Sequence, residues 1–165
     1  MVEAPEFRDC APAVWVMLYA GIRPGEVVRL HWRDVDLEER VISVRSRTSK
    51  TGGIRHVTIH AVLWRLLAGY GAGGPAGLLC PPNWPVRWRL LRKKAGWGLH
   101  NRFGEWSADA LRHTYASYHA KWFRDFSLLQ LEMGHRSSSL LRERYLNMDC
   151  LLYTSPSPRD KRQSR

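Results

Sequence analysis

The chain has 165 residues, which is enough for one domain with a substantial hydrophobic core. It contains no apolar run near the roughly 18 residues of a membrane helix, no signal-peptide segment, and no cysteine spacing typical of a disulfide framework or a zinc site. The formal net charge of +11 favours a polyanionic partner, above all a nucleic acid, and the cysteine usage favours a reducing cytosol.

The first elements expected along the chain are two helices. Residues 11–21 form an apolar stretch of helical length, and Gly21 closes it as a C-terminal cap. Pro24 suits the first turn of a second helix over residues 25–32, because its missing N–H needs no partner there.

A β-hairpin is predicted next. Acidic residues in 34–38 mark a turn, and the alternating, β-branched segments 39–46 and 54–60 predict two strands. The Gly-containing segment between them predicts a turn that carries Lys50 at its tip.

Two further helices are expected around a flexible connector. Residues 61–70 predict a helix with leucines on one side, and residues 69–77 are glycine-rich. Residues 86–95 predict a basic amphipathic helix, for which a solvated face and a phosphate-contacting face are equally good interpretations. Its candidate DNA-binding residues are Arg87, Arg89, Arg92, Lys93 and Lys94.

The last helices follow a serine. Ser107 can cap a helix, Asp125 to Met133 predict another that Gly134 ends, and Ser137–Ser139 can cap a final helix with Tyr145. The buried stripe predicted for the first of these helices is Ala108, Leu111, Tyr115, Tyr118 and Trp122. The expected fold class is therefore α+β, mainly α-helical, with a small antiparallel hairpin or sheet packed on a helical domain.

The segment from residue 150 onward differs in character from the rest. It lacks apolar periodicity, and its prolines and serines leave a helix no place to continue. Its back-translation resembles a transposon-end sequencing adapter, so we expect residues 150–165 to be a translated adapter and disordered. The domain is then expected to cover residues 1–149, which keep most of the positive charge.

Four short segments carry the candidate chemistry. In chain order they are GIRPGEVVRLHWRDVD, SKTGGIRHVTI, DALRHTYAS and MGHRSSSLLRERYLN. Their order and surroundings resemble the catalytic domain of the tyrosine recombinases, the phage integrase family, over about residues 11–147. The resemblance implies a domain that lacks the family's N-terminal DNA-clamping domain and the helix after the nucleophile.

The residue types suit the cutting of a phosphodiester. That reaction needs a nucleophile, a proton for the leaving oxygen, and cations where charge builds on the phosphoryl oxygens. Arg23 and Arg112 can clamp one phosphate, because a planar guanidinium binds two oxygens and stays charged. The resemblance implies that Tyr145 attacks phosphorus, that Lys50 protonates the leaving 5′ oxygen, and that His135 donates to the phosphate.

Three more residues complete the candidate site. Glu26 is interpreted either as a partner that orients Arg23 or as an ordinary acid on a helix surface, and His113 as a supporting residue. Asp109 stands where the family usually has a histidine. It is interpreted as an ion-pair partner of Arg112, three residues away on one helix, or as a base.

The resemblance implies site-specific recombination or integration through a 3′-phosphotyrosyl intermediate, without metal or other cofactor. The expected partner is double-stranded DNA, on which the full-length protein forms a homo-oligomer, a tetramer, with no membrane partner. The expected location is the cytoplasm, in association with the nucleoid, and the expected origin is prokaryotic or viral. The alternatives are relaxation of DNA in the manner of a type IB topoisomerase and a catalytically impaired DNA-binding remnant of a recombinase.

Overall fold

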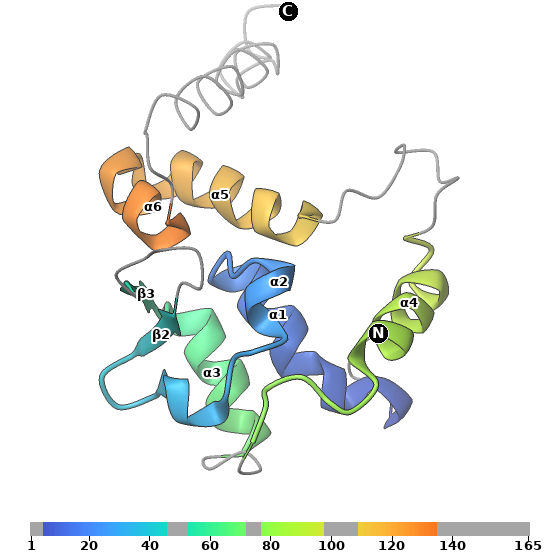
Figure 1. The fold of residues 1–165 in the computed structure, drawn as a ribbon. Helices are drawn as coiled ribbons and strands as arrows, with labels where there is room; N and C mark the ends of the chain where they lie inside the picture. The colour runs from blue at the N-terminus through green and yellow to red at the C-terminus, as the bar shows by residue number, and fades with distance from the viewer. Residues whose placement is uncertain (1–4, 46–52, 72–76, 98–108, 135–165) are drawn as a thin grey trace, which may run out of the picture.

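The computed structural model describes residues 5–45, 53–71, 77–97 and 109–134. Its mainly helical composition with one small antiparallel sheet confirms the predicted fold class (Figure 1). In chain order the elements are the 3-10 helix η1 (Pro5–Cys10), α1 (Ala11–Tyr19), α2 (Pro24–Val27), the 3-10 helix η2 (Trp32–Asp34), β1 (Val35–Asp36), β2 (Val41–Arg45), β3 (Ile54–Thr58), α3 (Ala61–Tyr70), α4 (Trp84–Lys94), α5 (Ala110–Phe123) and α6 (Phe126–Met133).

Helix α1 forms the centre of the core, and it is apolar on nearly all sides because η1, α3 and α5 all contact it. Its end agrees with the prediction: Gly21 has a φ of +61°. A Cβ atom added to Gly21 would stand 2.4 Å from the Tyr115 ring on α5. Glycine is therefore required at this position both for the left-handed backbone and for the close approach of α1 to α5.

The second helix is shorter than predicted over residues 25–32. Helix α2 covers only Pro24–Val27, and the backbone hydrogen bonds that follow it span three residues instead of four. The chain then extends, and His31 pairs with Leu78 in an isolated β-bridge. Leu30 is buried although it lies outside the helix. The spacing of apolar residues over 25–32 therefore reflects burial of the turn after α2 and not a longer helix.

The two predicted strands are confirmed as β2 and β3, which pair antiparallel with Ile42 opposite Val57. The short strand β1 was not predicted; it pairs with the other edge of β2, so the sheet order is β1-β2-β3. The carboxylate of Asp36 accepts two backbone N–H groups of the following turn, which explains the acidic residues there. Lys50 lies outside the described residues.

Helix α3 begins and ends where the sequence predicts, and its Leu63 and Leu67 are fully buried. Helix α4 begins two residues earlier than predicted, at Trp84, whose ring stacks on Trp88 at 5.4 Å between ring centroids. Leu91 is the other fully buried side chain of that helix, so α4 rests on an apolar face and keeps basic residues outside.

The buried stripe predicted for α5 is wrong in its second half. Leu111 and Tyr115 are buried as predicted, but Tyr118 is 60% exposed and Trp122 is 72% exposed. The buried face instead continues through smaller or polar side chains, because α5 lies close against α1 and α6 there. These side chains are Ala116, His119 and Ala120.

Helix α6 agrees with the prediction at both ends. The Asp125 carboxylate accepts the backbone N–H of Leu128, and Gly134 follows the helix with a φ of +60°. Within the described ranges no helix combines the length and apolarity of a membrane span. The predicted cap and stripe residues Ser107 and Ala108, the final helix with Tyr145, and the segment 150–165 lie outside the described residues.

Candidate active site

Arg23 occupies the position before α2, where its own helix holds it. Its backbone N–H donates to the Glu26 carboxylate at 3.0 Å, and its Nη1 donates to the same carboxylate at 3.3 Å. Its Nη2 donates to the backbone carbonyl of Gly134 at 3.3 Å, at the end of α6. Its side chain remains 36% exposed, so this guanidinium is held in place and is still open to a ligand.

Glu26 is not a surface acid, because its side chain is only 13% exposed. Arg55 donates two hydrogen bonds to its carboxylate, of 2.7 and 2.6 Å. Burial by itself raises the pKa of Glu26. The hydrogen bonds and charge of Arg55 outweigh that effect, with help from Arg23, and lower this pKa to about 2. Glu26 is therefore ionised at neutral pH and joins the two arginines.

Arg55 was not singled out from the sequence, although it connects three elements. It lies on β3, binds Glu26 of α2, and donates from Nε to the backbone carbonyl of Glu132 on α6 at 2.8 Å. Val57, two residues along the same strand, is buried, so Arg55 shares the strand face that points inward. An arginine on the buried face of a strand needs a carboxylate partner. The inward position of Arg55 in the predicted strand was therefore the sequence signal that could have identified it.

Arg112 lies on α5 and is 3% exposed. Its Nη1 donates to the backbone carbonyl of Gly21, and its Nη2 donates to that of Met133 at 2.6 Å. Burial, together with the positive charges of Arg23 and Arg55, lowers its pKa to about 10. The guanidinium stays charged at neutral pH.

Arg23 and Arg112 thus meet at the C-terminal end of α6. They donate to the consecutive carbonyls of Gly134 and Met133, where the helix dipole favours positive charge. A Cβ added to Gly134 would stand 3.1 Å from the Arg55 side chain, so glycine permits this crowding. His135 follows directly in the sequence; it lies outside the described residues, as do Lys50 and Tyr145.

The other predicted residues on α5 lie at its beginning. Asp109 precedes the helix, and its backbone carbonyl accepts the N–H of the half-buried His113 at 2.8 Å. Among the described residues no ion pair joins Asp109 to Arg112, although the Asp109 charge acts to raise the pKa of Arg112. The expected ion pair is replaced by the two backbone carbonyls that the Arg112 guanidinium binds.

The basic face of α4 is partly occupied by the N-terminal segment. Arg87 donates to the Glu6 carbonyl and pairs with Asp9, and Lys94 pairs with Glu6. Arg92 lies over the Trp88 ring at 5.6 Å. Of the five predicted DNA-binding residues, Arg89 and Lys93 are exposed, and their side chains pair with none of the residues that the structure describes.

The Glu26 geometry predicts a specific acid sensitivity. Because the folded-state pKa of Glu26 lies near 2 and its ordinary value is 4.5, its contribution to stability is complete above about pH 4.5 and is lost as the pH falls toward 2. At pH 7 we expect the wild-type protein to unfold at a higher urea concentration than the Glu26→Gln variant. The difference between the two unfolding midpoints should become smaller as the pH falls from 4.5 to 3. A difference that stays constant over this window would contradict the assignment.

Part of the chain is similar to a known protein family. Residues 6–70 match the model of the phage integrase family. A search of curated proteins finds no match. The XerA recombinase crystal structure aligns with a TM-score of 0.66 and 22% identity, covering 94% of this chain and 61% of that one.

Two further structures share the fold. The catalytic domain of bacteriophage HP1 integrase aligns with a TM-score of 0.65 and 18% identity, covering 96% of this chain and 89% of that domain. The Tn1549 transposon integrase in complex with a circular intermediate DNA aligns with a TM-score of 0.63 and 19% identity, covering 91% of this chain and 61% of that one. Residues 6–70 are thus similar to the phage integrase family, and the chain shares its fold with these recombinase and integrase structures.

Proposed function

We propose that this chain is the catalytic domain of a site-specific recombinase that breaks and rejoins double-stranded DNA. The observation that carries the proposal is the meeting of Arg23 and Arg112 at the end of α6, directly before His135. Two fixed guanidinium groups at one place suit a phosphate whose charge grows during cleavage. The chain spans 61% of the length of the XerA recombinase that it resembles, so the activity of the whole protein is part of the proposal.

The proposed roles follow the exposure of each arginine. Arg23 is the exposed member and binds a non-bridging phosphoryl oxygen first, while Glu26 and Arg55 hold it in position. Arg112 is the buried member, and two of its five N–H donors bind the carbonyls that orient it. Electrostatic stabilisation of the transition state is therefore built into the fold before DNA arrives.

The covalent step uses residues outside the described ranges. The Tyr145 oxygen gives its proton to solvent water and bonds to phosphorus, while the bond from phosphorus to the 5′ oxygen breaks and Lys50 gives that oxygen a proton. His135 donates to the phosphate. The phosphodiester energy remains in the 3′-phosphotyrosine, so a second 5′ hydroxyl can reverse the step and join a new strand.

The expected partners are double-stranded DNA and further copies of the protein, in a tetramer on DNA. The proposed location is the cytoplasm, in association with the nucleoid, and the proposed origin is prokaryotic or viral. The solved structures above are recombinases and integrases, which gives the topoisomerase alternative no support. We further propose that Arg89 and Lys93 on α4 contact the DNA backbone, because they project from α4 into solvent.

Covalent capture from a pool of nicked duplexes with randomised sequence tests this function. Denaturation-resistant protein–DNA adducts are isolated and their DNA is sequenced. A recombinase is expected to enrich one common site, with the protein attached to a 3′ end. Adducts without a common sequence, together with relaxation of a plasmid that lacks the site, would instead identify a topoisomerase, and the absence of adducts would identify a binding remnant.

Asp109 is expected to weaken the clamp without taking part in proton transfer. Its charge lies near Arg112 and opposes an incoming phosphate. Asp109→Asn should tighten binding to the captured site by about two- to fivefold, the effect of a charge interaction worth under about 1 kcal/mol, and Asp109→His should raise the single-turnover cleavage rate. Glu38→Gln removes an exposed acid as the control. A fall in the cleavage rate of both Asp109 variants would identify Asp109 as a base.

A further inference from the structure

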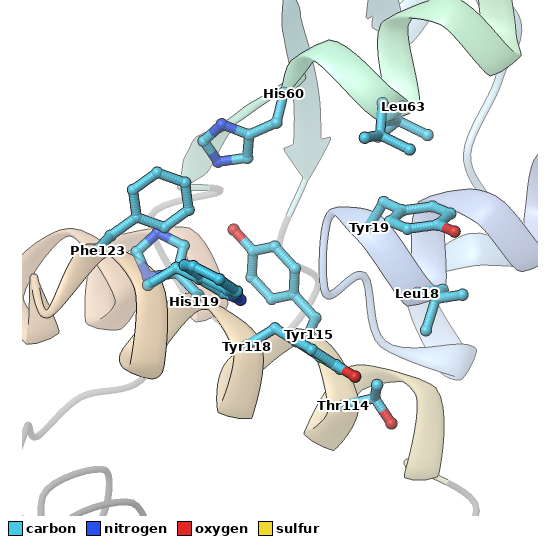
Figure 2. A pocket seen from close by; sticks show the side chains of 11 residues that line it. Leu18, Tyr19, His60, Leu63, Thr114, Tyr115, Tyr118, His119 and Phe123 are labelled. Atoms are coloured by element: carbon cyan, nitrogen blue, oxygen red, sulfur yellow. The ribbon is translucent and has the colours of Figure 1, made fainter. Parts of the chain in front are cut away.

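Three side chains from separate elements gather beside α6, at a place that the proposed cleavage does not use. His60 lies between β3 and α3, His119 on α5 and Glu132 on α6, and one ligand atom from each lies within 4.8 Å of the others. His119 Nε2 stands 3.6 Å from Glu132 Oε2. Figure 2 shows the His60 and His119 rings lining one pocket, each beside the Phe123 ring, with the Tyr115 hydroxyl pointing toward the space between the two imidazoles.

The two imidazoles are buried without the partners that they need. His119 is 2% exposed, and neither of its ring nitrogens has a hydrogen-bond partner within the part of the chain that the structure describes. His60 Nε2 is likewise buried without one. A neutral imidazole carries one donor and one acceptor, and leaving both unsatisfied inside a protein costs free energy. A ligand that takes electron pairs from both rings removes much of that cost.

Two further hydrogen bonds orient the Glu132 carboxylate. The Tyr115 hydroxyl donates to Glu132 Oε2 at 2.5 Å, and the Thr58 backbone N–H donates to Oε1 at 3.1 Å. Glu132 is itself 1% exposed. Outer partners of this kind orient the ligands of metal sites.

We propose that His60, His119 and Glu132 bind one divalent transition-metal ion of the zinc class. Two imidazole nitrogens and a carboxylate oxygen suit zinc, whereas magnesium and calcium favour sites made of oxygen ligands. Ligand atoms 2.0–2.1 Å from zinc stand about 3.4 Å apart in a tetrahedron, so the widest pair must close by about 1.4 Å. Rotation of the half-buried His60 supplies this movement.

The ion has a structural role. It links the β3–α3 junction, α5 and α6, and the backbone of α6 just beyond Glu132 carries the carbonyls that receive Arg112 and Arg23. Arg55 donates to the carbonyl of Glu132 itself. Metal binding is therefore expected to fix the end of α6 without touching DNA, and the proposal stands whether or not the chain cuts DNA.

Cobalt titration of the whole chain after chelator treatment tests the site. We expect one equivalent of Co²⁺ to give the visible absorption of a low-symmetry, nitrogen- and oxygen-ligated ion, and Zn²⁺ to displace it. Zinc at about 100 times its Kd should raise Tm by about 5–10 °C. His60→Gln should lose both responses; His60 makes no side-chain cap to α3, so this variant is expected to fold.

His56→Gln is the matched control, because His56 is an exposed histidine on β3, the strand that precedes His60. It should bind Co²⁺ as wild type does. Two results would overturn the proposal: wild type without a stoichiometric cobalt spectrum, or a His60→Gln variant that keeps it. Either would leave His119 as a neutral ring packed between Phe123 and Tyr115, at centroid distances of 4.8 and 5.6 Å.

Discussion

Arg112→Ala is expected to lower the single-turnover rate of DNA cleavage by a factor of about 10²–10³, the usual effect of losing one donor that stabilises transition-state charge. Arg112 is the most buried cation of the clamp, and two backbone carbonyls from different elements fix its guanidinium. The rate is measured on the DNA site recovered by covalent capture, under conditions where binding is saturated.

The same substitution leaves the Gly21 and Met133 carbonyls without their donor, so folding must be measured beside activity. Arg112→Lys keeps the charge, but a single ammonium cannot reproduce the planar fork, and its cleavage rate should also fall. Arg89→Ala, which removes an exposed arginine from α4, should leave the chemical step unchanged. A folded Arg112→Ala protein that cleaves within about twofold of wild type would remove Arg112 from the site.

Glu26→Ala is expected to lower the free energy of unfolding by about 3 kcal/mol. The Arg55–Glu26 pair is mostly buried, with side-chain exposures of 15% and 13%, and removing the carboxylate leaves the Arg55 charge without its partner. Urea denaturation at pH 7 measures the change. Glu38→Ala, at an exposed turn position, should change the stability by less than about 0.5 kcal/mol.

A double substitution separates the pair from the individual side chains. Glu26→Ala combined with Arg55→Ala should cost less than the sum of the two single changes, because the second change removes the charge that the first one left unpaired. Additive costs would show that Glu26 and Arg55 contribute independently. The account of Glu26 as the link between Arg23 and Arg55 would then be wrong.

Local signals in the sequence predicted those elements whose ends are marked by a characteristic residue. Gly21 and Gly134 mark helix ends because each adopts the left-handed backbone that glycine favours. The prediction of a helix over residues 25–32 was wrong beyond Val27. The turn that follows α2 buries Leu30, so the apolar residues there have the spacing of a helix without forming one. The predicted burial of Tyr118 and Trp122 was also wrong, although the helix itself is present. Large aromatic residues at helical spacing can face an open pocket as well as a core.

The supporting residues of the site were harder to predict than the arginines. Arg55 and Glu132 each occupy an inward position, beside Val57 on β3 and between Leu129 and Met133 on α6. A charged residue in an apolar register signals a buried partner, but the partner lies in a distant segment that periodicity cannot identify. The structure supplies that identity: Glu26 for Arg55, and Thr58, Tyr115 and His119 around Glu132.

The proposed function depends most directly on a covalent bond that Tyr145 forms to DNA as it breaks the strand. The most direct test compares adduct formation by wild type, Tyr145→Phe and Tyr118→Phe on the captured site, read as label that stays with the protein after denaturation. Tyr118 is an exposed tyrosine on α5 and serves as the matched control. Wild type and Tyr118→Phe should form the adduct, and Tyr145→Phe should bind the same DNA and form none. An adduct that persists in Tyr145→Phe would contradict the account.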